Sequence, residues 1–248
     1  MKYLSNLSFW LLVIFLPIGT RKLIYEIIPN LPYGAVFIYA SDIFIVLFIL
    51  LNWRYFRIPS LFASLFIFFS LLSTLFSSNF YISSYLLSEI VILYLLAAIL
   101  GEFIKKKKRF KDILKLLSLV SVLEALLAIF QFGRQHSLGL GILGEEIFSP
   151  IMTGIAKINI GQGTLVRSYG TFPHPNILAA FLILGLFSLI YFRLELGWEI
   201  ARFTKDNVLW KKIILNIFLA LCIFIVYLGL VLTFSRSALL VFGFLTLS

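Results

Sequence analysis

Long apolar runs that carry almost no charge constrain this chain more than any other feature. Residues 61–76, for example, consist only of leucine, isoleucine, phenylalanine, alanine, serine and threonine. Such runs approach the ~20 residues that an α-helix needs to cross a bilayer, and they lack the alternation of apolar and polar residues typical of membrane β-strands. Only 13% of the 248 residues are charged, whereas soluble domains contain about 25%. The sequence therefore predicts an all-α, polytopic transmembrane helical bundle.

The apolar runs predict about eight spans, the last of them truncated by the end of the chain. We place the spans at 5–19, 35–52, 60–77, 84–101, 112–132, 174–192, 213–233 and 236–248. We treat 1–248 as a single transmembrane helical domain, incomplete at its C-terminus. The charged start and apolar middle of residues 1–20 lack a small-residue cleavage site, which favours an uncleaved first span over a signal peptide.

Basic residues gather in alternate segments between the predicted spans. The densest run is Lys105–Arg109, and most of the 21 lysines and arginines fall on the same side if the N-terminus is cytoplasmic. The positive-inside rule then places the N-terminus and these basic segments in the cytoplasm. The run Lys105–Arg109 is therefore better explained as a signal for membrane orientation than as a binding site for nucleic acid. The glycine-rich loop 133–173 becomes extracytoplasmic, and we expect it to fold back on the membrane surface rather than form a separate domain.

Two arginines stand at the predicted extracytoplasmic ends of apolar segments. Arg167 precedes the span at 174–192, and Arg236 begins the span at 236–248 with Ser235 as its expected N-cap. A helix N-terminus favours anions and disfavours a nearby cation. An arginine can nevertheless lie there if an anion binds between the arginine and the helix N-terminus. The guanidinium group of arginine suits phosphate. We therefore predict that Arg167 and Arg236 bind a diphosphate; the alternative is that each side chain reaches lipid headgroups.

Several other polar residues lie near these positions or within spans. Asn176 and His174 flank the start of the sixth span; His174 is either a phosphate ligand or base, or simply a residue packed at the helix start. Asp42 and Glu89 lie toward the outer ends of their spans, where we expect them to support the arginines. Charged groups within spans are costly and are functional candidates. Glu124 and Gln131 are seven residues apart on one helix face, and either a structural contact or a catalytic role suits them.

Metal and cofactor motifs are missing from the sequence. The three aspartates are far apart, so there is no Asp-x-Asp site for a nucleotide-sugar donor, and no His-Glu-x-x-His zinc motif occurs. The single cysteine, Cys222, excludes an internal disulfide. We expect neither a metal nor a cofactor.

The stretch from Arg167 through Gly170-Thr-Phe-Pro-His174-Pro-Asn176 to Ala179, followed by Thr233-Phe-Ser-Arg236, resembles the O-antigen ligase/O-antigen polymerase family. Weaker similarity lies at Ser41-Asp42 and from Val122 to Gln131. The resemblance implies a bacterial inner-membrane glycosyltransferase that acts on the outer face. Its partners would be an undecaprenyl-diphosphate-linked glycan donor, a glycan or lipid A-core acceptor, and the lipid bilayer. In that family the matching arginines bind the donor's phosphates.

Family members are longer and carry a later outer loop with a functionally important histidine, so we expect this chain to represent only the N-terminal portion. Two other functions remain open. A non-enzymatic transporter of lipid or polysaccharide, such as a flippase, would require polar groups along a path through the membrane. An interaction subunit of an envelope-assembly complex would not need the arginines for glycan transfer.

Overall fold

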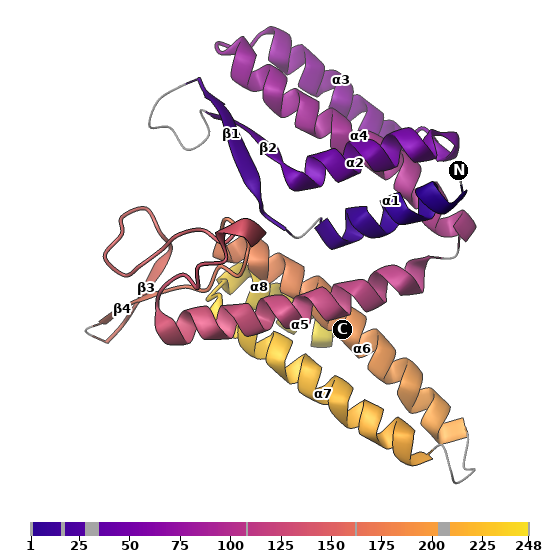
Figure 1. Cartoon of the computed structure of the whole chain (residues 1–248), viewed down its shortest axis with the longest axis vertical. Coiled ribbons are helices and arrows are strands. Elements are labelled where there is room, and N and C mark those ends of the chain that lie inside the picture. Colours follow the sequence, from indigo (N-terminus) through magenta and orange to yellow (C-terminus); the bar gives the residue numbers. More distant parts are fainter. Residues whose placement is uncertain are drawn as a thin grey trace. The chain divides into compact units, whose positions relative to one another are not determined.

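The computed structural model describes residues 2–15, 18–27, 35–107, 109–161, 163–202 and 209–247. The chain groups into two compact units, Met1–Phe110 and Lys111–Ser248, and each is described by itself. Both are helical, and each carries one antiparallel β-hairpin in addition (Figure 1). The all-α prediction is correct for the helical scaffold, whereas it missed both hairpins. The prediction of a single transmembrane domain stays a prediction.

The described residues of the first unit form four α-helices and one hairpin. Its elements are α1 (Lys2–Phe15), β1 (Arg21–Glu26), β2 (Ala35–Tyr39), α2 (Ala40–Asn52), a 3-10 turn η1 (Trp53–Tyr55), α3 (Leu61–Leu75) and α4 (Phe80–Lys107). Three fully buried aromatic rings join α1, α2 and α4. The ring centroids of Phe9 and Phe103 are 5.2 Å apart, and Phe103 packs edge-on to Phe48 with a centroid distance of 5.3 Å. Burial of such rings is a large apolar contribution to packing.

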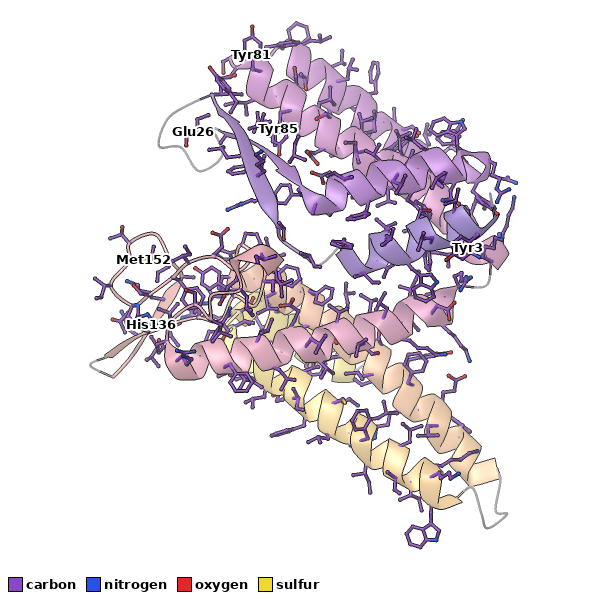
Figure 2. The ribbon with its side chains drawn as sticks, viewed as in Figure 1. Tyr3, Glu26, Tyr81, Tyr85, His136 and Met152 are labelled. Atoms are coloured by element: carbon purple, nitrogen blue, oxygen red, sulfur yellow. The ribbon has the colours of Figure 1, made fainter. Side chains whose placement is uncertain are left out.

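The predicted span at 35–52 is wrong at its start. Residues Ala35–Tyr39 form β2 and pair antiparallel with β1, so that the helix begins only at Ala40. Val36, Phe37 and Ile38 have the β-branched and aromatic side chains that suit a strand. The Tyr85 hydroxyl, labelled in Figure 2, donates a hydrogen bond to the Phe37 carbonyl at 3.0 Å and so links this strand to α4.

The second unit contains the other four helices and the other hairpin. Its elements are α5 (Phe110–Arg134), a 3-10 turn η2 (Gly141–Leu143), β3 (Lys157–Ile160), β4 (Gly163–Val166), α6 (Pro175–Arg202), α7 (Leu209–Leu232) and α8 (Arg236–Leu247). One core cluster joins α5, α6, α7 and α8. Small residues let the helices approach closely: a Cβ on Gly185 of α6 would lie 2.2 Å from the Ser121 Cβ of α5.

Four described helices are long and apolar enough to cross a membrane: Phe80–Lys107, Phe110–Arg134, Pro175–Trp198 and Trp210–Leu232. The apolar segments Tyr3–Phe15 and Leu61–Leu75 are shorter, and α2 has only 13 residues. Large apolar side chains face outward even on these shorter helices; Phe62 and Phe69 of α3 are 82% and 61% exposed. The chain is therefore a helical protein of membrane type, with four helices of spanning length in the described part rather than about eight.

Candidate functional site

The candidate site is built on segment 166–171, which carries Arg167 and is hydrogen-bonded to α5. Ser168 donates a hydrogen bond from its hydroxyl to the Ala128 carbonyl of α5 at 2.8 Å. Gln135, one residue past the end of α5, accepts the Val166 N–H at 2.7 Å. Ser168 and Val166 are both about 1% exposed. Because buried backbone groups need partners, these bonds fix the path of the segment.

Gln131 of α5 makes four hydrogen bonds to this region and is 1% exposed. Its Oε1 accepts the N–H groups of Tyr169 (3.1 Å) and Gly170 (2.7 Å). Its Nε2 donates to the Gly170 carbonyl and to Glu145 Oε1, both at 2.8 Å. An amide side chain offers two donors and one oxygen with two lone pairs, so the hydrogen-bonding capacity of Gln131 is fully used.

Glu124 lies two helical turns earlier on the same face of α5 and holds the next residue of the segment. Its carboxylate accepts the Thr171 hydroxyl at 2.6 Å and the Thr171 N–H at 3.0 Å. Gly170 passes so close that a Cβ there would lie 2.4 Å from Glu124 Oε2, and its φ of +60° is one that favours glycine. Of the two alternatives for Glu124 and Gln131, the contacts match the structural one.

The two arginine motifs meet, although 66 residues separate the bonded pair. Arg167 Nε donates to the Thr233 carbonyl at 2.6 Å, and the Ser168 N–H donates to the Leu232 carbonyl at 3.2 Å. These carbonyls lie at the C-terminal end of α7, where a cation is favoured by the helix dipole. The C-terminal end of α7 therefore stabilises the charge of Arg167, whereas the N-terminus of α6 disfavours it.

Asn176 is the second partner of Arg167. Its Oδ1 accepts a hydrogen bond from Arg167 Nη2 at 2.6 Å. Partial burial lowers the pKa of the Arg167 guanidinium. An arginine side chain nevertheless stays protonated in proteins, so the group is charged. Its hydrogen-bond acceptors are neutral, and no carboxylate pairs with it among the described residues of this unit. The positive charge is thus solvated by oxygen atoms but not neutralised.

His174 caps the N-terminus of α6. Its Nδ1 accepts the Asn176 N–H at 3.1 Å, and its carbonyl accepts the N–H groups of Ile177 and Leu178. Since Nδ1 accepts, the ring proton of neutral His174 is on Nε2. Desolvation, together with the positive charge of Arg167, lowers the pKa of His174 below 6.5. The neutral ring can therefore donate a hydrogen bond from Nε2, and its role as a phosphate ligand or base stays a prediction.

Arg236 is the first residue of α8, and Ser235 occupies the N-cap position. The Ser235 carbonyl accepts the Leu239 N–H at 3.0 Å, and its hydroxyl lies 3.4 Å from that of Ser237. The Arg236 side chain is exposed and has no hydrogen bond or ion pair to the residues that the structure describes. It stands three residues after Thr233, which binds Arg167, at the turn where Phe234 adopts a φ of +48°.

Asp42 and Glu89 belong to the first unit. Asp42 Oδ2 accepts the Tyr39 N–H at 2.8 Å and so caps the start of α2, while Glu89 lies within α4. Their predicted support of Arg167 and Arg236 stays a prediction. His136 is an exposed residue of the loop that follows α5 (Figure 2).

Sequence reasoning missed Gln135 and Glu145, and it did not foresee the contact of Thr233 with Arg167. Glu145 is 6% exposed and accepts the N–H groups of Leu138 and Leu140 as well as the Gln131 amide. A buried carboxylate is unusual, yet nothing in the sequence distinguishes this acid from its neighbour Glu146. Thr233 contributes only a backbone carbonyl to Arg167, which no residue pattern reveals.

In the part of the chain that the structure describes, no group of three or more His, Cys, Asp or Glu side chains could hold a metal ion. No family model, curated protein or solved structure matches the chain.

Proposed function

We propose that this chain belongs to a membrane glycosyltransferase that transfers or polymerises a glycan carried on undecaprenyl diphosphate, in the manner of an O-antigen ligase or polymerase. The observation that carries the proposal is the contact between the two arginine motifs. Arg167 donates to the carbonyl of Thr233, which lies three residues before Arg236. Two arginines whose backbones lie on one turn-rich end of a helical unit suit a diphosphate.

The free donors of Arg167 support phosphate binding. A guanidinium has five N–H groups; one binds Thr233 and one binds Asn176, which leaves three at the Nη1 and Nη2 end. Those can bind phosphate in the bidentate geometry that arginine favours. The Nε2–H of His174 is a further donor, and the N-terminus of α6 adds a partial positive charge.

The proposed reaction needs no metal. A hydroxyl of the acceptor, a second lipid-linked glycan or lipid A-core, attacks the anomeric carbon of the donor sugar. The bond from that carbon to the diphosphate oxygen breaks, the electron pair leaves with undecaprenyl diphosphate, and the hydroxyl proton passes to a base. Arg167 and Arg236 stabilise the leaving diphosphate as its charge develops.

The proposal places the N-terminus in the cytoplasm and the arginine site on the outer face of the bacterial inner membrane. The distribution of basic residues supports this orientation through the positive-inside rule. The loop 133–173 and the start of α6 would then face the periplasm. A proposed count of about eight spans requires the shorter apolar helices to cross the membrane together with the four longer ones.

The test is glycan transfer in membranes that contain the whole protein. Arg167→Ala and Arg236→Ala should each abolish transfer without lowering membrane abundance, and binding of undecaprenyl diphosphate should fall at least tenfold, since a charged hydrogen bond contributes ~1.5–3 kcal/mol. The matched control is Arg134→Ala, an exposed arginine at the end of α5. Unchanged transfer in both site variants would remove the arginines from the mechanism.

The rival functions give different results in the same experiment. A transporter would move the lipid-linked glycan across vesicle membranes without forming a new glycosidic bond. An assembly subunit would retain transfer after Arg167→Ala while its complex dissociated. Either result would refute the proposed enzyme.

A further inference from the structure

A groove of about 620 Å³ lies between α6 and α7, away from the arginine motifs. On α6 it is lined by Ile190, Arg193, Leu194, Gly197 and Trp198, and on α7 by Asn216 and Ile223. The α6 positions follow the spacing i, i+3, i+4, i+7 and i+8, which places them on one helix face. The groove therefore runs along both helices and is apolar apart from Arg193 and Asn216.

The position of Arg193 along α6 puts the groove at the opposite membrane edge from the candidate site. Eighteen residues separate Pro175 from Arg193, and at 1.5 Å rise per residue they span about 27 Å. The hydrocarbon core of a bilayer is about 30 Å thick. Trp198 and Trp210 lie beyond this level and are 67% and 71% exposed, as expected for aromatic residues at a membrane–water interface.

Arg193 has no acidic partner among the described residues. Its Nε donates to Asn216 Oδ1 at 3.1 Å, a neutral acceptor. The nearest acid in sequence, Glu195, forms an ion pair with Lys111 of α5 instead. An exposed guanidinium in an otherwise mostly apolar groove thus keeps an uncompensated positive charge, and its Nη groups have no partner among the described residues.

We propose that this groove binds an anionic phospholipid of the leaflet opposite the candidate site. The phosphate binds the Nη groups of Arg193, and one acyl chain lies against Ile190, Leu194 and Ile223. Basic pockets between transmembrane helices bind anionic headgroups in this way, and the volume falls within the ~300–1,000 Å³ of ordinary ligand sites. The proposal does not depend on glycan transfer.

Native mass spectrometry of the delipidated whole protein in detergent, titrated with phosphatidylglycerol or phosphatidylcholine, tests this site. Wild-type protein should bind phosphatidylglycerol at least tenfold more tightly than phosphatidylcholine. Only phosphatidylglycerol carries a net negative charge, which strengthens its hydrogen bonds to Arg193. Arg193→Gln should remove this preference. Lys105→Gln, an exposed basic residue of α4 outside the groove, is the matched control and should keep it.

A second variant tests the groove with the arginine intact. A Cβ on Gly197 meets nothing within 4 Å, so Gly197→Leu adds a side chain to the lining of the groove and should weaken phosphatidylglycerol binding about tenfold. Equal binding of the two lipids by wild-type protein would overturn the proposal, as would an unchanged preference in Arg193→Gln. If Arg193→Gln does not fold, full binding by Gly197→Leu overturns it instead.

Discussion

Gln131 gives the sharpest test of how the arginine segment is held. Replacement by leucine, which has a similar size but no polar atoms, removes all four hydrogen bonds of a side chain that is 1% exposed. At roughly 1 kcal/mol of net stability per bond, we expect the free energy of unfolding to fall by about 4 kcal/mol. Tyr169 and Gly170 would then lose their partners on α5, and Arg167 beside them would lose its fixed position.

Reversible unfolding of the whole protein by SDS in mixed micelles measures this loss, and binding of undecaprenyl diphosphate measures its effect on the site. The control is Phe130→Leu, the neighbouring residue on α5, whose ring is 61% exposed and whose replacement should change stability by less than about 1 kcal/mol. A Gln131→Leu protein as stable as this control would refute the idea that the amide anchors the segment.

Two further predictions concern helix packing and pH. Gly185→Ala should destabilise the protein by about 1–3 kcal/mol in the same SDS titration, because its Cβ would meet Ser121 at 2.2 Å. The control is Gly101→Ala, whose Cβ meets nothing within 4 Å and which should be neutral or stabilising by up to ~1 kcal/mol. Equal effects of the two substitutions would contradict the close contact between α5 and α6. The lowered pKa of His174 means that the unfolded state binds its proton more readily, so wild-type protein should lose stability as pH falls below 6.5. His174→Asn keeps an N-cap and should flatten this slope in thermal unfolding between pH 7.5 and 5.5; an unchanged slope would exclude His174 as its source.

The long helices were predictable because hydrophobicity and length determine them. The segment predicted at 112–132 lies within the helix Phe110–Arg134. The segment predicted at 213–233 lies within the helix Leu209–Leu232 except for its last residue. The strand Ala35–Tyr39 was not predictable in this way. An apolar segment suits either a helix or a strand by composition, and its conformation depends on pairing with residues 21–26.

The sequence indicated some residues of the candidate site, but it could not indicate their contacts. Charge at the ends of apolar segments identified Arg167 and Arg236, and helical spacing placed Glu124 and Gln131 on one face. Their partners are mostly backbone groups far along the chain, such as the Gly170 carbonyl 39 residues from Gln131. Backbone donors and acceptors are the same in every residue other than proline, so a sequence cannot show which of them a side chain will meet.

The side chains of this region that bind α5 and those that are exposed to solvent belong to different residues. Ser168 and Thr171 point into the protein and are 1% and 3% exposed, whereas His174, Asn176 and Arg236 are exposed. Under the proposed function, changes to the exposed residues would alter which headgroup is recognised while Ser168 and Thr171 keep their hydrogen bonds to α5. One scaffold of this kind would then accept chemically different lipid carriers through substitutions at a few surface positions.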